Sequence, residues 1–295
     1  MLALLTICWA SRLNGISPMI DNEREIKRQV REFYDRVGWK EISEGLYQNA
    51  RYEDLRPVTQ EYIHRCHLRV NRHIAPSGKL FLDAGSGPIQ YPEYLDYSRN
   101  YQLRICADIS MTALKAARDR IGGQGAYVVS DVSHLPFTSN SFDAVVSLHT
   151  IHHLPARQHK QAYLELHRVL AQERSAVIVN GWETSPLNEF FHRIKNRLKK
   201  RKGVGPVNGS LPEELELGIG TFVEKNDPQT LKRVLQGSLK FRILVWRSAN
   251  TNVLRFFIRE EWFGRFWLRV LYRLEEFFPS FFGEKGLYPL IVISK

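Results

Sequence analysis

The chain has 295 residues, 43% of them hydrophobic and 25% charged, which favours a folded domain with a sizeable core over a disordered chain. Lys and Arg (42) outnumber Asp and Glu (31), and the net charge of +11 favours anionic partners such as nucleic acid, acidic lipid or phosphorylated substrates. Three cysteines without CxxC spacing argue against a disulfide framework and a cysteine-based metal site, and indicate a reducing compartment.

The chain opens with the apolar stretch "MLALLTICWA", which has no basic stretch before it and is too short to cross a bilayer. We interpret residues 1–18 as a loose extension, with a secretory signal as the alternative, and expect the functional chain to begin near Met19. In residues 19–78, "REIKRQVREFYDRVGW" and "PVTQEYIHRCHLRVNRHI" are polar with helical apolar spacing, which predicts an N-terminal helical segment.

From residue 79 onward, short apolar strands alternate with helices. The pattern predicts strands at 79–85, 102–110, 125–133, 142–150 and 175–182, and helices at 111–121 and 157–170. Such alternation is typical of a parallel sheet with helices on both faces. We therefore expect a doubly wound α/β core over residues 79–182.

Beyond residue 182 the alternation stops. Residues 183–240 are predicted to form a basic helical cap that includes "RIKNRLKKRK" at 193–202. Residues 241–295 are predicted to form strands at 241–248 and 288–295 with an inserted aromatic and basic helix between them.

The inserted helix carries two repeats at four-residue spacing, each of which lies along one side of a helix. They are Phe263, Trp267 and Leu271, and Arg265, Arg269 and Arg273. One interpretation is a membrane-surface or lipid-tail contact, to which "RIKNRLKKRK" would add attraction for anions. The alternative is a cap helix packed on the sheet with its arginines solvated.

The first predicted strand runs into "LDAGSGP", an acid followed by a loop with two glycines. Gly85 and Gly87 let the backbone approach a ligand at the carboxyl edge of the sheet, although the third glycine of a dinucleotide fingerprint and the lysine of a P-loop are missing. Asp108 ends the next strand, where it can accept ribose hydroxyls, and Asp131 follows the third, where it can accept a base amine. Each acid alone suits a cap or a turn, but with Asp83 they mark three successive strand ends and favour a ligand site.

The ordered motifs "LDAGSGP", "ADIS", "SDVSHLPFTSNSFDAVVSLHTIHHLP" and "ELHRVL" resemble those of class I S-adenosylmethionine-dependent methyltransferases, in the methyltransferase type 11 group that includes quinone-biosynthesis enzymes. The resemblance covers roughly residues 79–181 and implies a Rossmann-like seven-stranded sheet with N-terminal helices and a helical cap near the C-terminus. It also implies S-adenosyl-L-methionine as cofactor.

The same resemblance implies which residues hold the cofactor. Asp83 would orient the glycine loop near the methionine amino group, Asp108 would take the ribose hydroxyls, and Asp131 the adenine amine. Pro88 and Ile89 stand where many members have a further glycine, which stiffens the loop. The implied cofactor-binding set is Asp83, Gly85, Gly87, Asp108, Ile109, Asp131, Val132 and His149.

Methyl transfer is an in-line displacement at a carbon activated by sulfonium, so positioning supplies much of the rate. A general base is needed only when the acceptor must lose a proton, and His149 and His152 are the candidates. We favour the alternative in which His152 and His153 cap the next helix or pack structurally, and expect no metal, because no acid or cysteine lies at ligand spacing. Tyr34 and Trp39 are expected to close over cofactor or acceptor, with core packing as the alternative.

The sequence thus predicts an enzyme, a methyltransferase acting on a small or lipid-like acceptor, located in the cytoplasm with peripheral contact to anionic membrane. One alternative is an RNA or protein methyltransferase using the basic surface, less favoured for RNA because no RNA-binding module is recognisable. The other is a non-catalytic scaffold that binds the cofactor or only a partner. Neither the acceptor atom nor the oligomeric state is predicted, because specificity resides in the variable cap.

Overall fold

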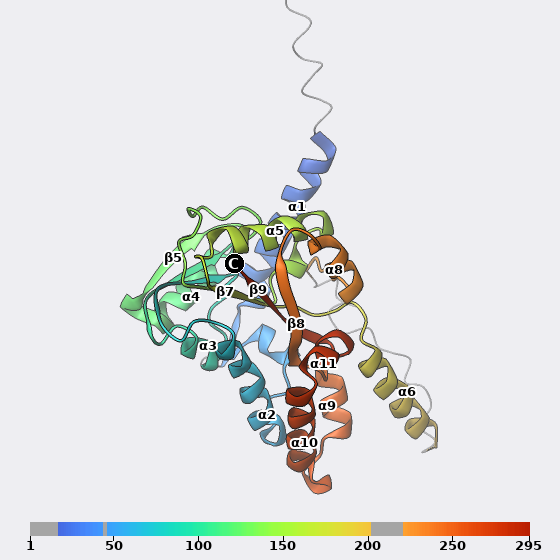
Figure 1. The fold of residues 1–295 in the computed structure, drawn as a ribbon. Coiled ribbons are helices and arrows are strands. Elements are labelled where there is room, and N and C mark those ends of the chain that lie inside the picture. Colours follow the sequence, from blue (N-terminus) through green and yellow to red (C-terminus); the bar gives the residue numbers. More distant parts are fainter. Residues whose placement is uncertain (1–16, 44–45, 202–220) are drawn as a thin grey trace, which may run out of the picture.

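A seven-stranded sheet forms the centre of the computed structural model, which describes residues 17–43, 46–201 and 221–295 (Figure 1). The strand order is β5-β4-β3-β6-β7-β9-β8, with β3 to β7 parallel and β9 antiparallel to both β7 and β8. The strands are β3 (Gly78–Ala84), β4 (Tyr101–Asp108), β5 (Gly125–Val129), β6 (Ala144–Leu148), β7 (Ser175–Val179), β8 (Lys240–Arg247) and β9 (Tyr288–Ser294). The predicted doubly wound sheet is confirmed, and the two C-terminal strands complete it.

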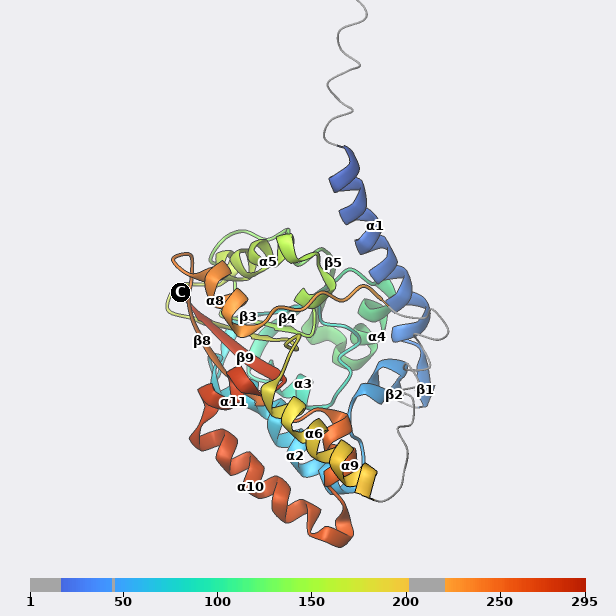
Figure 2. The ribbon, with the colours of Figure 1, turned by 90° about the vertical axis from the view of Figure 1, so that its right-hand side faces the viewer.

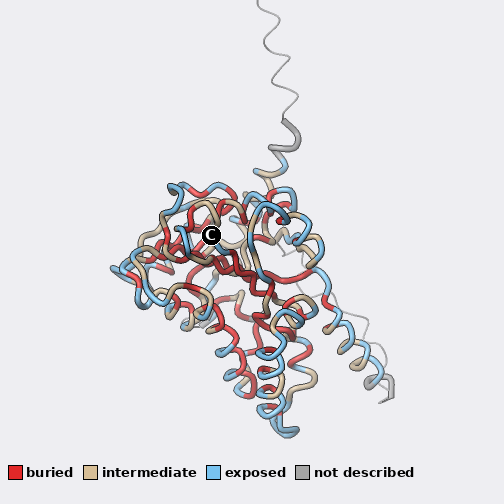
Figure 3. The backbone as a smooth tube through the Cα atoms, viewed as in Figure 1, coloured by how far each residue is buried: buried red, intermediate tan, exposed pale blue. Residues whose placement is uncertain are grey.

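Helices cover both faces of this sheet because its strands are apolar on both sides. Successive strand residues point to opposite faces, so Leu82 and Val145 join a core cluster under α5 (Ala156–Val169) and α8 (Pro228–Leu235). Phe81 and Val146 join a second cluster under α3 (Glu93–Asp96) and α4 (Met111–Ile121). The middle of the red, buried chain in Figure 3 is this layered centre, and further buried residues lie in the helices at the lower end.

The N-terminal helical segment lies beside the sheet and over its edge. It consists of α1 (Ser17–Phe33), a π-helical turn η1 (Tyr34–Gly38), a small hairpin of β1 (Glu41–Ser43) and β2 (Leu46–Tyr47), η2 (Gln48–Tyr52), α2 (Pro57–His67) and η3 (Leu68–Arg72). Ion pairs of Lys27 with Asp131 and of Glu23 with Arg157 tie α1 to the body. Short 3₁₀ turns η4 (Gly122–Gln124) and η5 (Ile151–His153) complete the core region.

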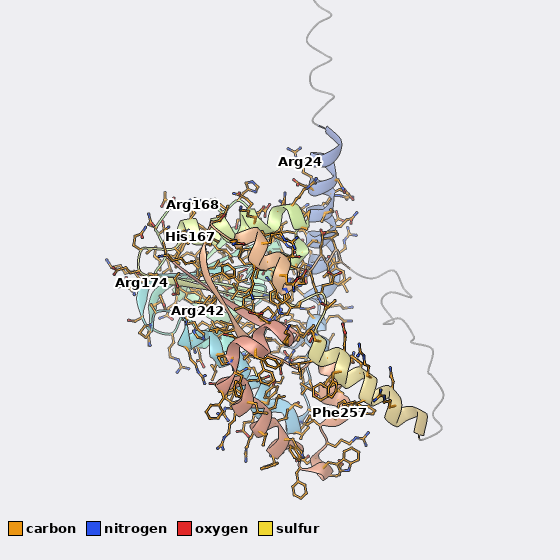
Figure 4. All side chains as sticks on the ribbon, turned by 45° about the vertical axis from the view of Figure 1, so that its right-hand side comes forward. Arg24, His167, Arg168, Arg174, Arg242 and Phe257 are labelled. Atoms are coloured by element: carbon orange, nitrogen blue, oxygen red, sulfur yellow. The ribbon has the colours of Figure 1, made fainter. Side chains whose placement is uncertain are left out.

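Helices of the C-terminal half gather at the end of the molecule opposite α5 and α8 (Figures 1 and 2). They are α6 (Pro186–Arg201), α9 (Thr251–Phe257), η6 (Glu260–Trp262), α10 (Gly264–Phe277) and α11 (Pro279–Lys285). α9 and α10 share a third hydrophobic cluster with α2, which includes Tyr62, Leu254 and Leu268. Figure 4 shows Phe257 of α9 beside α6, where its ring lies 5.5 Å from that of Phe191.

Parts of two predicted segments lie outside the described residues: 1–16 of the N-terminal extension, and 202–220 of the basic cap, including Lys202 of "RIKNRLKKRK". The five-part division of the chain stays a prediction. Within the described ranges, no helix combines the length and apolar character needed to span a membrane.

Candidate cofactor and acceptor site

The carboxyl edge of the sheet borders a cavity of about 870 Å³. Along this edge, in strand order from β5 to β8, the cavity is lined by Asp131, Asp108, Asp83, His149, Gly181, Tyr288 and Arg247. The edge therefore changes from acidic over β5, β4 and β3 to basic and aromatic over β6, β7, β9 and β8. With strands about 4.8 Å apart, the acidic half spans about 10 Å and the basic half about 14 Å.

Every residue that the sequence assigned to cofactor, base or lid lines this one cavity. They are Tyr34, Trp39, Asp83, Gly85, Gly87, Asp108, Ile109, Asp131, Val132, His149 and His152. The structure thus brings together residues from η1, β3, β4, η5 and the segments that follow η1, β3, β4, β5 and β6. Their individual roles toward a ligand stay predictions.

The glycine loop has no room for side chains at its first glycine. Gly85 has φ +76°, and a Cβ there would lie 2.1 Å from Oγ1 of Thr150. Gly87 has φ +54°, and a Cβ there would lie 3.1 Å from the Trp39 ring. Ile89, in the place where the resembled family has a glycine, is fully buried with φ +56°, a conformation that a β-branched residue rarely adopts. Thr150 on one side and Trp39 on the other therefore leave little room for the loop to move.

Asp108 links the glycine loop to the start of α4. Its Oδ2 accepts a hydrogen bond from the Gly87 N–H at 2.9 Å, and its Oδ1 accepts from the Ser110 N–H at 2.8 Å. Burial raises the pKa of this carboxyl to about 6, against the lowering effect of the two backbone N–H groups. A carboxylate has about four lone-pair sites, so the ionised group keeps acceptors for two ribose hydroxyls.

Asp83 forms a buried ion pair with Arg104, which sequence reasoning missed. Burial raises the pKa of the Asp83 carboxyl, and the guanidinium opposes that shift. Arg104 also donates to the Tyr94 carbonyl at 2.6 Å. The predicted link from Asp83 to the glycine loop is not among the hydrogen bonds of the described residues. An arginine inside the apolar strand "QLRICAD" was the available signal, because a buried charge needs a partner.

Asp131 is held by a lysine from the N-terminal helix. Lys27 forms an ion pair with its Oδ2, and Ser133 donates to its Oδ1 through both N–H and Oγ, each at 2.8 Å. Burial raises the pKa of Asp131, but Lys27 and Ser133 outweigh it and the pKa is lowered. An ammonium group therefore stands where the sequence predicts an adenine amine, and it shows that this carboxylate accepts from a nitrogen donor.

The two predicted lid residues form a stacked pair over the glycine loop. The rings of Tyr34 and Trp39 lie 4.9 Å apart, and the Tyr34 hydroxyl lies 2.7 Å from Nε2 of His153. Nδ1 of His153 faces the Phe222 carbonyl at 2.8 Å. Because a carbonyl only accepts, Nδ1 carries the proton and Nε2 accepts from Tyr34. With both nitrogens engaged, His153 fits the structural interpretation, and burial lowers its pKa to about 4.

His149 and His152 both have a pKa below the ordinary value for histidine. Burial lowers the pKa of His149 to about 3, with further lowering by the charges of His67 and Lys225. Burial also lowers the pKa of His152 well below its ordinary value, and Nδ1 of His152 has no hydrogen-bond partner in the described part of the chain. His149 has φ +56°, an uncommon conformation that recurs at functional sites.

Two cations of the basic half were not found from the sequence. Arg247 is buried and paired with Glu53, and its guanidinium lies 4.7 Å from the centre of the Tyr288 ring. Lys225 lines the cavity without an ion pair or hydrogen bond to any described residue, and burial lowers its pKa. Neither residue had a local motif to mark it. The basic half therefore contains one cation that the described residues leave unneutralised.

A doubly wound sheet with a glycine loop and strand-end acids defines an α/β domain that binds a nucleoside-containing ligand at its carboxyl edge. Residues 82–178 match the family model described as methyltransferase domain. This part of the chain is a class I S-adenosylmethionine-dependent methyltransferase domain, and S-adenosylmethionine is the cofactor of that class. The residues present suit it: Asp108 retains free acceptor sites, Asp131 accepts from nitrogen, and Gly85 and Gly87 leave the loop backbone bare.

Known proteins similar to this chain include methyltransferases. Methyltransferase GfsG of Streptomyces halstedii is 24% identical over 155 residues, which is 48% of this chain; the chain spans about half, 54%, of that relative's length. Phosphoethanolamine N-methyltransferase 1 of Haemonchus contortus, solved with phosphoethanolamine and S-adenosylhomocysteine, is 11% identical with a TM-score of 0.54, over 95% of this chain and 51% of that one. The methyltransferase solved with the Trm112 activator of Haloferax volcanii is 15% identical with a TM-score of 0.50, over 80% and 91% of the two chains. The two structures support the fold alone.

Proposed function

We propose that the protein transfers a methyl group from S-adenosylmethionine to a small or lipid-like acceptor that carries an anionic group. One observation carries this proposal: a single cavity joins the acidic half, with its glycine loop, to a basic and aromatic half. A volume of about 870 Å³ lies near the upper end of the range for ligand pockets, about 300–1,000 Å³. The cavity has room for a cofactor over β3 to β5 and an acceptor over β6 to β8.

Lys225 is the basis for the anionic group. A cation in a partly desolvated site attracts an anion far more strongly than it would in bulk water, and Lys225 has no internal carboxylate to neutralise it among the described residues. Arg247, by contrast, is already paired with Glu53. Tyr91, Tyr288 and Trp39 line the same cavity and suit a planar or apolar acceptor body.

The chemistry requires the acceptor atom in line with the bond between the methyl carbon and sulfur. The lone pair of the acceptor would form the new bond to carbon, and the electron pair of the broken bond would remain on sulfur. When bound, S-adenosylmethionine supplies that methyl group on a sulfonium centre. Lys225 would hold the anion of the acceptor, and Tyr34 and Trp39 would exclude water from the site. His152, which lines the cavity, would take the proton from a hydroxyl or amine acceptor, and an anion bound beside it would raise the depressed pKa of that imidazole.

The proposal is tested with methyl-labelled S-adenosylmethionine and a panel of acceptors that share one aromatic body and differ in carrying a carboxylate, a phosphate or no charge. We expect labelled product from the anionic acceptors. Lys225→Met should raise the KM for them at least tenfold and leave cofactor affinity unchanged. The matched control is Lys232→Met, because Lys232 is half-exposed on α8, pairs with Glu284 and does not line the cavity. Equal KM values for wild type and Lys225→Met would contradict the anionic acceptor.

A further inference from the structure

The outer side of α10 is covered with exposed rings. Together with η6 it presents Trp262, Phe263, Phe266, Trp267, Leu274 and Phe277, which we call the aromatic face. Phe263 is 77% exposed and Phe277 is 76% exposed. With about 200 Å² for a whole aromatic side chain, the five rings expose on the order of 600 Å², the upper end for the largest apolar patch of a monomer. Phe278 and Phe281, also exposed, follow directly at the start of α11.

The residue spacing divides α10 into three sides, since each residue turns the helix by about 100°. The aromatic face lies on one side. Leu268, Tyr272 and Glu275 lie about 150° away from it and are buried against the body. Arg265, Arg269 and Arg273 occupy the third side and are exposed. Leu271, which the sequence placed in line with Phe263 and Trp267, instead packs partly buried in the cluster with α2 and α9.

The buried side of α10 is held by directional bonds that prevent the helix from turning its rings inward. Glu275 accepts from the Tyr62 hydroxyl at 2.8 Å, from Arg69 at 2.9 Å, and from Ser248 through N–H at 2.9 Å and Oγ at 2.6 Å. These bonds fix α10 to α2, η3 and the end of β8. The exposure of the rings is therefore a property of the fold (Figure 3).

Positively charged side chains lie on α10 beside the exposed rings. Arg273 has no ion pair within the described residues, while Arg265 and Arg269 form exposed pairs with Glu260 and Glu61 that anionic headgroups can replace at little cost. Helix α6, at the same end of the molecule in Figures 1 and 2, adds Arg193 and further basic residues. The whole chain has a net charge of +11.

From the rings, the flanking arginines and the fixed orientation, we infer that the aromatic face docks on an anionic lipid bilayer. Trp and Phe insert at the boundary between headgroups and acyl chains, and arginines beside them meet anionic headgroups. The positive charge beside the rings favours anionic lipid over an apolar protein partner or a second copy of this chain. This inference goes beyond the proposed function and is independent of it, because docking requires neither cofactor nor acceptor.

The test is flotation of the full chain with vesicles of phosphatidylcholine alone or phosphatidylcholine mixed with phosphatidylglycerol. We expect binding to the mixed vesicles, a blue shift of tryptophan fluorescence, and weakening with added salt. A triple variant, Phe263→Ser, Phe266→Ser and Trp267→Ser, should lose at least tenfold in affinity. The control is Met111→Ser, which alters an exposed apolar side chain on α4. Thermal unfolding of both variants checks the fold.

A second variant set tests the charge. Arg265→Gln, Arg269→Gln and Arg273→Gln together should weaken binding to the mixed vesicles. Binding of the triple ring variant at wild-type affinity would overturn the inference, as would a wild-type chain that floats with neither vesicle. Self-association that the ring substitutions abolish, in a chain that does not bind vesicles, would assign the face to a second copy of the chain and overturn it as well.

Discussion

The attachment of α10 predicts a large loss of stability from one substitution, Glu275→Gln. Glu275 is fully buried and its two oxygens accept four hydrogen bonds, one of them from the buried Arg69. The amide keeps the shape but replaces one accepting oxygen with an NH₂ donor. Donors would then face donors, and Arg69 would lose an ionic partner in a buried site.

The loss in free energy of unfolding depends on which hydrogen bonds Arg69 keeps in the variant. Breaking a buried ion pair costs about 3–5 kcal/mol. Arg69 keeps its bonds to Glu276 and to the Trp246 carbonyl, at 2.9 and 2.7 Å, so we place the loss in free energy of unfolding at the lower end, about 3 kcal/mol. With a urea m-value of about 3 kcal/mol/M, the unfolding midpoint should fall by about 1 M.

Urea unfolding followed by circular dichroism measures this shift. The matched control is Glu276→Gln, which changes the neighbouring carboxylate; that group is partly exposed and pairs with Arg69 and Arg72. Arg69 keeps its pair with the buried Glu275, and the Arg72 pair that is lost is exposed and contributes about 0–1 kcal/mol. The control midpoint should therefore move by less than about 0.3 M. If Glu275→Gln moved the midpoint no further than Glu276→Gln, the attachment described for α10 would be wrong.

Three further predictions concern the cofactor half. Gly85→Ala should abolish cofactor binding and lower stability by more than about 2 kcal/mol, whereas Gly237→Ala, at a turn residue with φ +73° and open space around it, should cost only about 1 kcal/mol and leave binding intact, as measured by calorimetry and urea unfolding. Lys27→Met should raise cofactor affinity because it removes the ammonium that competes for Asp131, while thermal unfolding of the unliganded chain should occur at a lower temperature; equal affinity in both proteins would argue against a ligand amine at Asp131. Because the ionised form of Asp108 accepts hydroxyls and its pKa is about 6, cofactor affinity should be constant above pH 7 and fall about tenfold per unit well below pH 6, and Asp108→Asn should abolish that slope.

The raised pKa of Asp108 also makes the stability of the folded chain depend on pH. Its folded pKa, about 6, lies above the ordinary value of 3.8, so the folded chain binds the proton more tightly than the unfolded chain. This group therefore makes the unliganded protein less stable as pH rises from about 4 to 6. Hydrogen bonds from a bound ligand to the ionised carboxylate would offset this loss of stability. Such a loss in the unliganded protein is typical of a site that holds a charge for function.

Local patterns predicted what depends on local sequence. Strands such as β3 and β6 are apolar on both faces, and helix α4 was predicted at its observed bounds because a helical repeat follows Ser110, whose Oγ accepts from the Ala113 N–H. The strand-end acids were found because parallel strands bring their carboxyl ends to one edge. All the predicted cofactor residues accordingly line one cavity.

The missed residues are those whose role depends on contacts distant in sequence. Lys27 meets Asp131 across 104 positions, and Arg247 meets Glu53 across 194. Lys225 comes from a loop with no periodic pattern. Leu271 is partly buried whereas Phe263 and Trp267 of the same repeat are exposed, because four-residue spacing does not reveal which residues the neighbouring α2 and α9 will cover. Such pairings arise from the packing of whole elements, and one sequence carries no local signal for them.

We propose that this cavity binds S-adenosylmethionine through the acids at its edge. Calorimetric titration of S-adenosylmethionine into the purified chain, with Asp108→Ala alongside, tests it most directly. We predict saturable binding by the wild type and at least a hundredfold loss in the variant, whose cooperative thermal unfolding shows that it is folded. Absence of binding by the well-folded wild type, or equal binding by both proteins, would contradict the account.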